Sequence, residues 1–209
     1  MTTFEHVMLG MNGAIAAGLT RRCGWPVAAV AGLAAAAPDW DGLTLLFSSS
    51  AFAAGHRLWG HNVLACVLVG TLIGLIDCRW AVLPRMAYWL GQMLRIEGAA
   101  SLAQNSRPVD GRRCSLWILV AIIATFSHLL ADMLVSGTAT LADWEVSLFW
   151  PWSRRGWVFP LVPWGDPGMT IVFVVGLFAL VRWRPHAQRV SLLTLLTLAA
   201  YMLIRGFLC

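Results

Sequence analysis

The sequence predicts an all-α, polytopic transmembrane helical bundle of about six spans, with one interfacial helix beside it. Of its 209 residues, 59% are hydrophobic and 12% are charged, and the mean hydropathy is +0.72, whereas a soluble domain carries roughly 25% charged residues. A bilayer core about 30 Å thick takes roughly 20 apolar residues per helix, so this length allows five or six spans. We therefore expect a single integral membrane domain over residues 1–209, with no separate soluble domain.

Six apolar stretches predict the helices that cross the membrane. The first two are short, rich in Gly and Ala, and separated only by Thr20 to Gly24, so we expect a hairpin in which small residues let the backbones approach closely. A seventh apolar segment, Trp80 to Leu94, contains Pro84 and Arg85 and is too short to cross, which predicts an interfacial helix. The polar segment Ser101 to Arg113 predicts a loop. The six stretches are Val7 to Leu19, Pro26 to Ala37, Trp59 to Ile76, Leu116 to Val135, Met169 to Trp183 and Val190 to Leu208.

Charge and cysteine usage exclude some classes of protein. The net charge is +5, but the chain has no lysine and its arginines are scattered between apolar segments, so we expect no nucleic-acid partner. The five cysteines show neither C-x-x-C nor zinc-finger spacing, which predicts ordinary thiols without a redox motif or a disulfide framework.

The arginines predict the orientation in the membrane, because cytoplasmic loops carry an excess of positive charge. In the six-span arrangement eleven of the fifteen lie on one side, which we assign to the cytoplasm, and most acidic residues lie on the other. This predicts a multi-pass protein of a bacterial-type inner membrane with both termini outside. The arrangement takes no account of histidine, yet it leaves only His186 on the cytoplasmic side. The histidines that it places toward the outer side are His6, His56, His61 and His128.

Ionisable residues in or beside apolar spans are costly and are functional candidates by default. His6 enters the first stretch, where a lone histidine can equally be a satisfied or surface residue. Asp39 and Asp41 follow the second stretch, where aspartate also favours turns. Alone, neither cluster identifies a site.

A third cluster surrounds Arg57. His56 and His61 can converge only across a bend or a helix start, and Gly60 permits such a bend. Arg57 has two open roles: to clamp a phosphate or another oxyanion, or to pair with Asp39 or Asp41.

The fourth cluster, within an otherwise apolar helix, is the strongest. A spacing of four places His128 and Asp132 on one helical face, where both can reach one ion. The alternative is a His–Asp hydrogen bond between helices, since a carboxylate often orients an imidazole. Together the four clusters offer four imidazoles and three carboxylates, which suit zinc, and also manganese or iron.

The number of candidate ligands is compatible with a site for one divalent ion or for two. A mononuclear catalytic zinc typically has three protein ligands and an open position, whereas two ions about 3.5 to 4 Å apart would use all seven residues. Either arrangement lowers the pKa of a bound water toward about 7. We expect catalytic roles for Arg57, Asp39 and Asp41.

The segment Ser136 to Gly168, rich in Trp and Pro, is expected to anchor the chain at the interface or to cover the site as a lid.

Taken in order, these motifs resemble the YdjM-like family of LexA-regulated, membrane-bound, metal-dependent hydrolases, over His6 to about Arg155. The matching stretches are Glu5-His6, Pro38-Asp39-Trp40-Asp41, His56-Arg57-Leu58-Trp59-Gly60-His61-Asn62, Ser127-His128 with Asp132, and Trp150-Pro151-Trp152-Ser153. The resemblance implies metal-site candidates His6, Asp39, Asp41, His56, His61, His128 and Asp132. The chain departs from the family pattern at Leu58, Gly60 and Asn62, where Gly, Thr and Ser are usual, so a hydroxyl contact is lost there.

The sequence therefore predicts a membrane-embedded hydrolase in which metal-activated water cleaves a phosphoester or acyl bond, in a lipid or lipid-linked substrate at the outer membrane face. One alternative is a metal-ion or proton transporter, whose site should lie near the midplane between repeated halves. Another is a non-catalytic protein in which the metal only joins helices. The sequence predicts no oligomeric state.

Overall fold

The computed structural model describes residues 1–95, 111–138 and 142–208. Regular structure in these ranges is helical, with isolated β-bridges only, which confirms the all-α prediction. The loop predicted from Ser101 to Arg113 lies mostly outside the described residues. The elements are α1 (Thr3–Ala16), α2 (Leu19–Cys23), α3 (Pro26–Ala36), the 3₁₀ helix η1 (Ala37–Leu46), α4 (Ser49–Gly55), α5 (Val63–Trp80), α6 (Val82–Met93), α8 (Gly111–Leu134), α9 (Pro167–Arg182), the 3₁₀ turn η2 (Arg184–His186) and α10 (Ala187–Leu208).

All six predicted apolar stretches are helices, but six spans are not confirmed. Three described helices are long and apolar enough to cross a membrane: Val63–Trp80, Cys114–Leu134 and Arg184–Phe207. Helices α1, α3 and α9 have 14, 11 and 16 residues. At 1.5 Å per residue they extend about 21, 17 and 24 Å, less than the bilayer core of about 30 Å.

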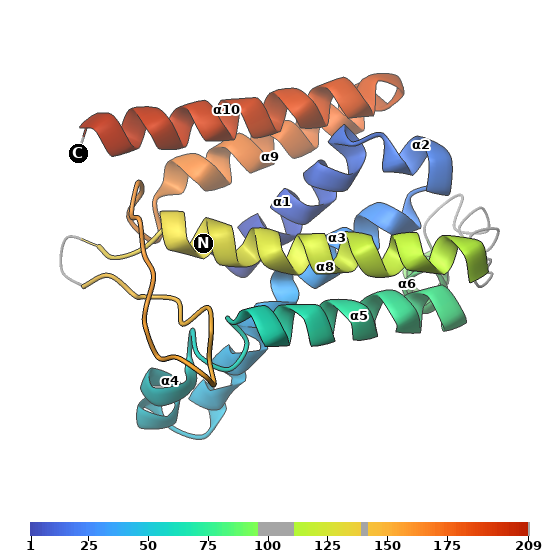
Figure 1. Cartoon of the computed structure of the whole chain (residues 1–209). Coiled ribbons are helices and arrows are strands. Elements are labelled where there is room, and N and C mark those ends of the chain that lie inside the picture. The colour runs from blue at the N-terminus through green and yellow to red at the C-terminus, as the bar shows by residue number, and fades with distance from the viewer. Residues whose placement is uncertain (96–110, 139–141, 209) are drawn as a thin grey trace.

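The short helices α1 and α3 form the centre of the bundle. Helix α5 packs on α8, α8 on α3, α3 on α1, α1 on α10, and α10 on α9, so α1 and α3 join two pairs of longer helices (Figure 1). Val27, Val30 and Ala34 of α3 are fully buried. These two helices are apolar because protein surrounds them, which explains why their composition resembled that of membrane spans.

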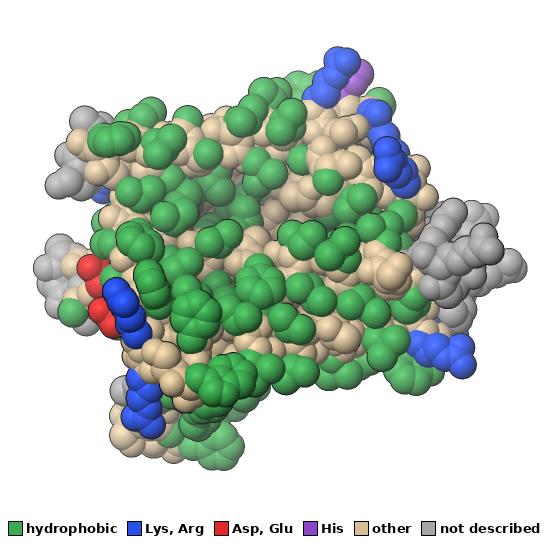
Figure 2. All heavy atoms as spheres, in the orientation of Figure 1, with side chains coloured by type: hydrophobic (Ala, Val, Ile, Leu, Met, Phe, Trp, Pro, Cys, Tyr) green, Lys and Arg blue, Asp and Glu red, His purple; other side chains and the backbone are tan. Residues whose placement is uncertain are grey.

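The outer surface of the long helices is apolar. Figure 2 shows hydrophobic side chains over the middle of one face, with charged side chains at both ends. Large exposed side chains include Leu68 of α5, Ile123 of α8, Phe178 of α9 and Leu193 of α10. A soluble monomer rarely exposes so extensive an apolar surface, so the bilayer is the solvent for this face.

Glycines bring the helices of the bundle close together. A Cβ atom on Gly74 of α5 would lie 2.6 Å from the Cα of Ile118 in α8, and one on Gly32 of α3 would lie 2.7 Å from Cγ of Met11 in α1. Only glycine fits at such contacts. The close approach expected within the α1–α3 hairpin is therefore present.

The segment predicted as an interfacial helix is the helix α6. Pro84 and Gly91 are buried, while Met86, Trp89 and Met93 are exposed. A short helix with one exposed apolar face suits an interface, and its place at the membrane surface stays a prediction.

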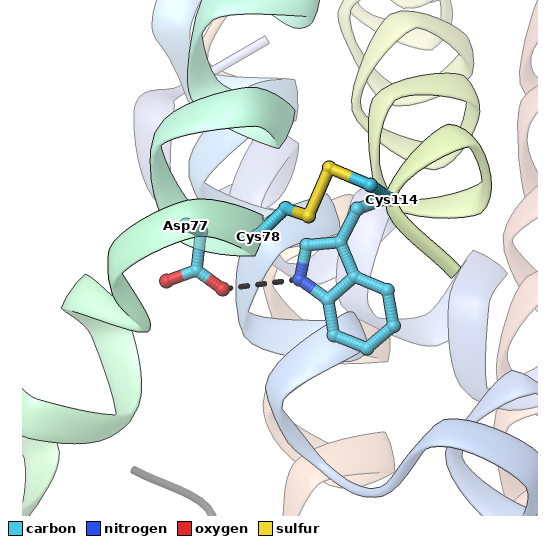
Figure 3. Close-up of a disulfide and its surroundings, with 4 residues drawn as sticks. Asp77, Cys78 and Cys114 are labelled. Carbon is cyan, nitrogen blue, oxygen red and sulfur yellow. Dashed lines mark hydrogen bonds between the residues drawn. A yellow bond between two sulfur atoms is a disulfide. The ribbon is translucent and has the colours of Figure 1, made fainter. Parts of the chain in front are cut away.

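The prediction that the cysteines are ordinary thiols is wrong for two of them. Cys78 at the end of α5 and Cys114 near the start of α8 form a disulfide (Figure 3). Beside it, Asp77 accepts hydrogen bonds from Nε1 of Trp117 and from the backbone N–H of Leu83. The pair is 36 residues apart in sequence and follows no motif; the packing of α5 on α8 brings it together.

We expect Cys78→Ser to lower the stability of the protein. A disulfide that closes a loop of this length contributes about 3–4 kcal/mol by restricting the unfolded chain. Thermal unfolding in detergent under non-reducing conditions should show a lower Tm than the wild type. Cys23→Ser, which removes a free and partly exposed thiol, is the control and should leave the Tm unchanged. Equal Tm values for both variants would contradict a stabilising disulfide.

Candidate metal centre

Segments far apart in the chain bring the seven predicted residues together where α1 and α5 begin and α8 ends (Figure 1). Helix α1 begins with a capping box in which Thr2 and Glu5 exchange hydrogen bonds, and this fixes His6 in the first turn. The seven residues are His6 from α1, Asp39 and Asp41 from η1, His56 and His61 from the segment between α4 and α5, and His128 and Asp132 from α8.

The pair His61 and His128 lies at the centre of this cluster, with Nε2 atoms 3.0 Å apart. Nδ1 of His128 lies 2.7 Å from the carbonyl oxygen of Ala35, and Nδ1 of His61 lies 2.9 Å from Oδ2 of Asp41. Carbonyl and carboxylate oxygens only accept hydrogen bonds, so both Nδ1 atoms donate. In the neutral imidazoles the two Nε2 atoms then face each other with lone pairs, an arrangement that requires a shared cation or proton.

Two carboxylates complete the surroundings of these nitrogen atoms. Oδ2 of Asp132 lies 3.4 Å from Nε2 of His61 and 3.6 Å from Nε2 of His128. Oδ1 of Asp39 lies 3.7 Å and 3.5 Å from the same two nitrogens. Ligands about 2.0–2.1 Å from a tetrahedral zinc ion lie about 3.3–3.4 Å from one another, so these spacings fit a divalent ion.

His6 lies beside this group. Its Nε2 is 3.1 Å from Oδ1 of Asp132, and its ring stacks on that of His128 with centroids 3.6 Å apart. Its Nδ1 is buried without a hydrogen-bond partner among the described residues, which is costly unless a ligand satisfies it. Two overlapping groups have ligand atoms within 4.8 Å of one another: His6, Asp39 and His128, and His61, His128 and Asp132.

Neither of these groups includes Asp41 or His56. Both carboxylate oxygens of Asp41 are already used: Oδ1 by Nδ1 of His56 at 3.0 Å, and Oδ2 by His61 and by the backbone N–H of Gly60. Burial raises the pKa of Asp41, but the hydrogen bonds from the two imidazoles outweigh it and hold that pKa well below its usual range. Asp41 therefore orients the imidazoles of His56 and His61, of which His61 is a candidate ligand.

His61 has a high affinity for positive charge. Burial alone lowers the pKa of this imidazole, but hydrogen bonds to Asp132 and Asp41 outweigh burial and raise the pKa to about 9. A metal ion that binds at this imidazole would displace its proton.

Arg57 pairs with neither Asp39 nor Asp41 among the described ion pairs, so that expectation is wrong. Its guanidinium lies 3.3 Å from Oδ2 of Asp132 and donates to the carbonyl oxygens of Val135 and Trp144. It is 4% exposed and lies over the Trp144 ring. Arg57 thus joins the end of α8 to the segment that follows it and neutralises Asp132.

We expect Arg57→Met to destabilise the fold. Removing one partner of a buried ion pair typically costs about 3–5 kcal/mol, because the other charge stays buried. Chemical denaturation in micelles should therefore show a lower free energy of unfolding. Arg155→Met is the matched control, since Arg155 also lies over a tryptophan ring, that of Trp157, but is exposed. Equal losses in the two variants would contradict a structural role for the Arg57 ion pair.

Two departures from the family pattern have local explanations. Asn62 is the N-cap of α5, where its Oδ1 accepts a hydrogen bond from the backbone N–H of Ala65 at 2.8 Å. Asparagine and serine cap a helix N-terminus about equally well. Gly60 lies so close to the carbonyl of Pro38 that a Cβ would overlap it. The positive φ of the turn, 59°, falls on Arg57 rather than on the glycine.

A cavity of about 510 Å³ opens onto the cluster. Asp39 and His56, with side chains 23% and 20% exposed, line it together with Arg57 and Asp132. Sequence reasoning missed two of its contributors: Thr3, whose hydroxyl donates to Oδ2 of Asp39, and the amino group of Met1, 2.5 Å from Asp132.

The Trp-rich segment forms the other wall of this cavity. Trp144 lies edge-on to His56, and both Trp144 and Trp164 line the cavity. Two tryptophans of the segment therefore lie beside the cavity, while its roles as an anchor and as a lid both stay predictions. His186 lies in η2, between α9 and α10, away from the cluster.

No curated protein and no solved structure matches the chain. The sequence profile of the YdjM inner membrane protein family matches residues 1–208. With nearly its whole length covered, and with apolar helices that can cross a membrane, the chain belongs to the YdjM inner membrane protein family.

Proposed function

We propose that this protein is a metal-dependent hydrolase acting on lipids at one face of the membrane. The observation that carries the proposal is the pair of imidazole Nε2 atoms, 3.0 Å apart, with carboxylate oxygens of Asp39 and Asp132 beside both. A divalent ion, zinc in the first place, would supply a Lewis acid there and lower the pKa of a water toward about 7.

The donor atoms suit such an ion. His61, His128 and Asp132 make a buried set of two nitrogens and one oxygen, the number and type of ligands that catalytic zinc sites use. His6 and Asp39 extend the set and leave room for a second ion. Manganese and iron accept the same donors.

The residues on the cavity side of the cluster are placed to bind and orient a substrate. His56 holds its Nδ1 proton on Asp41 and reaches the cavity, an arrangement suited to passing a proton at Nε2. Asp39 lines the same cavity. Arg57 lines the cavity too, with its charge balanced by Asp132.

The position of the cluster favours a lipid substrate over transport. His61 lies two residues before α5 begins, and Asp132 lies two residues before α8 ends. The centre is thus near the ends of two membrane-crossing helices, where headgroups lie, rather than near their middle, where transporters bind ions. That this end faces the non-cytoplasmic side stays the prediction of the arginine distribution in the six-span arrangement.

The decisive measurement is hydrolysis of a defined phospholipid by protein that is stripped of metal and then loaded with zinc, manganese or iron. We expect activity only with metal, and we expect Asp39→Asn to lower turnover by about 10²-fold or more with an unchanged Tm. A Tm loss in Asp39→Asn, with no hydrolysis by the metal-loaded wild type, would indicate a metal that only joins helices. Metal uptake into vesicles without hydrolysis would replace this proposal with the transporter. His186→Ala controls for loss of a remote histidine.

A further inference from the structure

A second cavity, of about 240 Å³, lies between α1, α3, α8 and α10 and shares no lining residue with the polar one. Leu9 and Gly13 of α1, with Ala17 just after it, line one side, and Val120 and Ala124 of α8 form one wall. Leu195 of α10 forms the other wall. It follows α1 from Leu9 to Ala17, about 12 Å at 1.5 Å per residue.

The lining suits only hydrocarbon. Among the described residues that line it, Ser127 alone has a polar side chain, and its hydroxyl already donates to the carbonyl oxygen of Ala124 at 2.7 Å. No charged side chain is among those lining residues. A sugar, phosphate or metal ion would lose its hydration there without replacement, whereas an alkyl chain would gain from burial.

The groove ends about one helical turn from residues of the metal centre. Two of the helices that line it carry a groove residue one turn away from a residue of the centre. Gly10 is one turn from His6 on α1, and Ala124 is one turn from His128 on α8. On α3, Ala31 is one turn from Ala35, whose carbonyl orients His128. Residues four apart share a helical face and lie about 6 Å from each other.

The groove also opens sideways toward the bilayer. Figure 2 shows a hollow between α10 and α8 on the apolar face. Ile123, which lines the groove, is 59% exposed. A chain already in the membrane can therefore enter between the two helices without crossing water.

We propose that this groove holds the hydrocarbon tail of the lipid whose headgroup reaches the metal centre. The inference rests on the proposed hydrolase function and adds how the substrate is recognised. Binding of the tail, and not of the headgroup alone, then positions the scissile bond at the metal centre. A long-chain lipid is accordingly the substrate class.

Gly13 provides the variant that tests the groove. A Cβ at this position would meet no atom within 4 Å, so Gly13→Leu can start its side chain into the groove, and replacing a helical glycine does not weaken α1. Ala200→Leu adds a larger apolar side chain on the exposed face of α10 and is the control. Ala17→Leu, at the far end of the groove, is a second filling variant.

The experiment uses zinc-loaded protein in lipid nanodiscs and phosphatidic acid with a diazirine at the end of one acyl chain. We expect crosslinks on Leu9–Ala17 and Val120–Ser127, reduced at least about tenfold by Gly13→Leu and Ala17→Leu but not by Ala200→Leu, the effect of losing burial of two methylene groups. Metal content should be equal in all four proteins. Turnover of the long-chain lipid should fall alongside the crosslinks, while turnover of a short-chain analogue should not.

Several outcomes separate the groove from the hydrolase. Crosslinks that Gly13→Leu leaves unchanged, or equal losses on long and short chains, would overturn the tail site while the hydrolase stands. Crosslinks in the groove without any hydrolysis would support the tail site and refute the hydrolase. Crosslinks between two copies through the α8–α10 face would overturn the tail site in favour of a dimer contact.

Discussion

His128→Ala should release the bound metal and lower hydrolysis by about 10³-fold or more. His128 supplies the Nε2 atom that faces His61, and its Nδ1 is held by the carbonyl of Ala35. It belongs to both groups of possible metal ligands, so its replacement removes one ligand from each group. A metal stabilises charge in the transition state by several kcal/mol, and each 1.4 kcal/mol is a factor of ten in rate.

The measurement is metal per protein by elemental analysis, made beside turnover on the same preparations. The wild type should carry near-stoichiometric metal and His128→Ala almost none. His128→Gln keeps more of the side-chain volume and should behave in the same way, which separates metal loss from a packing defect. His186→Ala, in η2, should retain both metal and turnover. Stoichiometric metal in His128→Ala would remove this histidine from the centre.

The helices of this fold could be predicted from the sequence, but the number of spans could not. Apolar runs locate helices well, because both lipid and protein interiors select the same side chains. The run Pro26 to Ala37 therefore resembled a span, although α3 is buried by α1, α5 and α8. Its 11 residues and its Ala content were the available indications that protein, not lipid, surrounds it.

Which residues meet could be predicted better than what each one does. The spacing of His128 and Asp132 placed both on one face, and the structure has them 3.6 Å apart. Asp39 and Asp41 looked equivalent in sequence. In a 3₁₀ helix, which has three residues per turn, side chains two positions apart point in different directions. Asp39 therefore faces the cavity, and Asp41 is buried behind the imidazoles.

The disulfide and the ion pair of Arg57 could not be predicted from the sequence patterns, and the reason is the same for both. Cys78 meets Cys114 only through the packing of α5 on α8. Arg57 meets Asp132, 75 residues later, at the end of α8, and it also donates to the carbonyl of Trp144 in the Trp-rich segment. Contacts of this kind depend on tertiary packing and leave no periodicity in the chain.

Asp41→Asn is expected to weaken metal binding by about 10–100-fold and to lower turnover at saturating metal by about 10²–10⁴-fold. Oδ2 of Asp41 accepts two N–H groups, from His61 and Gly60, whereas Oδ1 accepts only from His56. The single oxygen of asparagine will therefore stay at the Oδ2 position, and its NH₂ group will face His56. His61 keeps its tautomer but loses the negative charge behind it, which lowers its basicity as a ligand.

The larger effect falls on His56. With a donor opposite its Nδ1, this imidazole must carry its proton on Nε2, the atom that its ring presents away from Asp41, and it can no longer accept a proton there. In serine proteases the equivalent Asp→Asn exchange leaves the geometry intact yet costs about 10⁴-fold in turnover through the wrong tautomer. Metal titration and turnover of Asp41→Asn should be compared with Asp77→Asn, which alters a buried carboxylate that also accepts two N–H groups but lies at the disulfide end of α5. Asp77→Asn should lower the Tm and leave metal affinity intact, and turnover lost equally in both variants would show that Asp41 acts only through the stability of the fold.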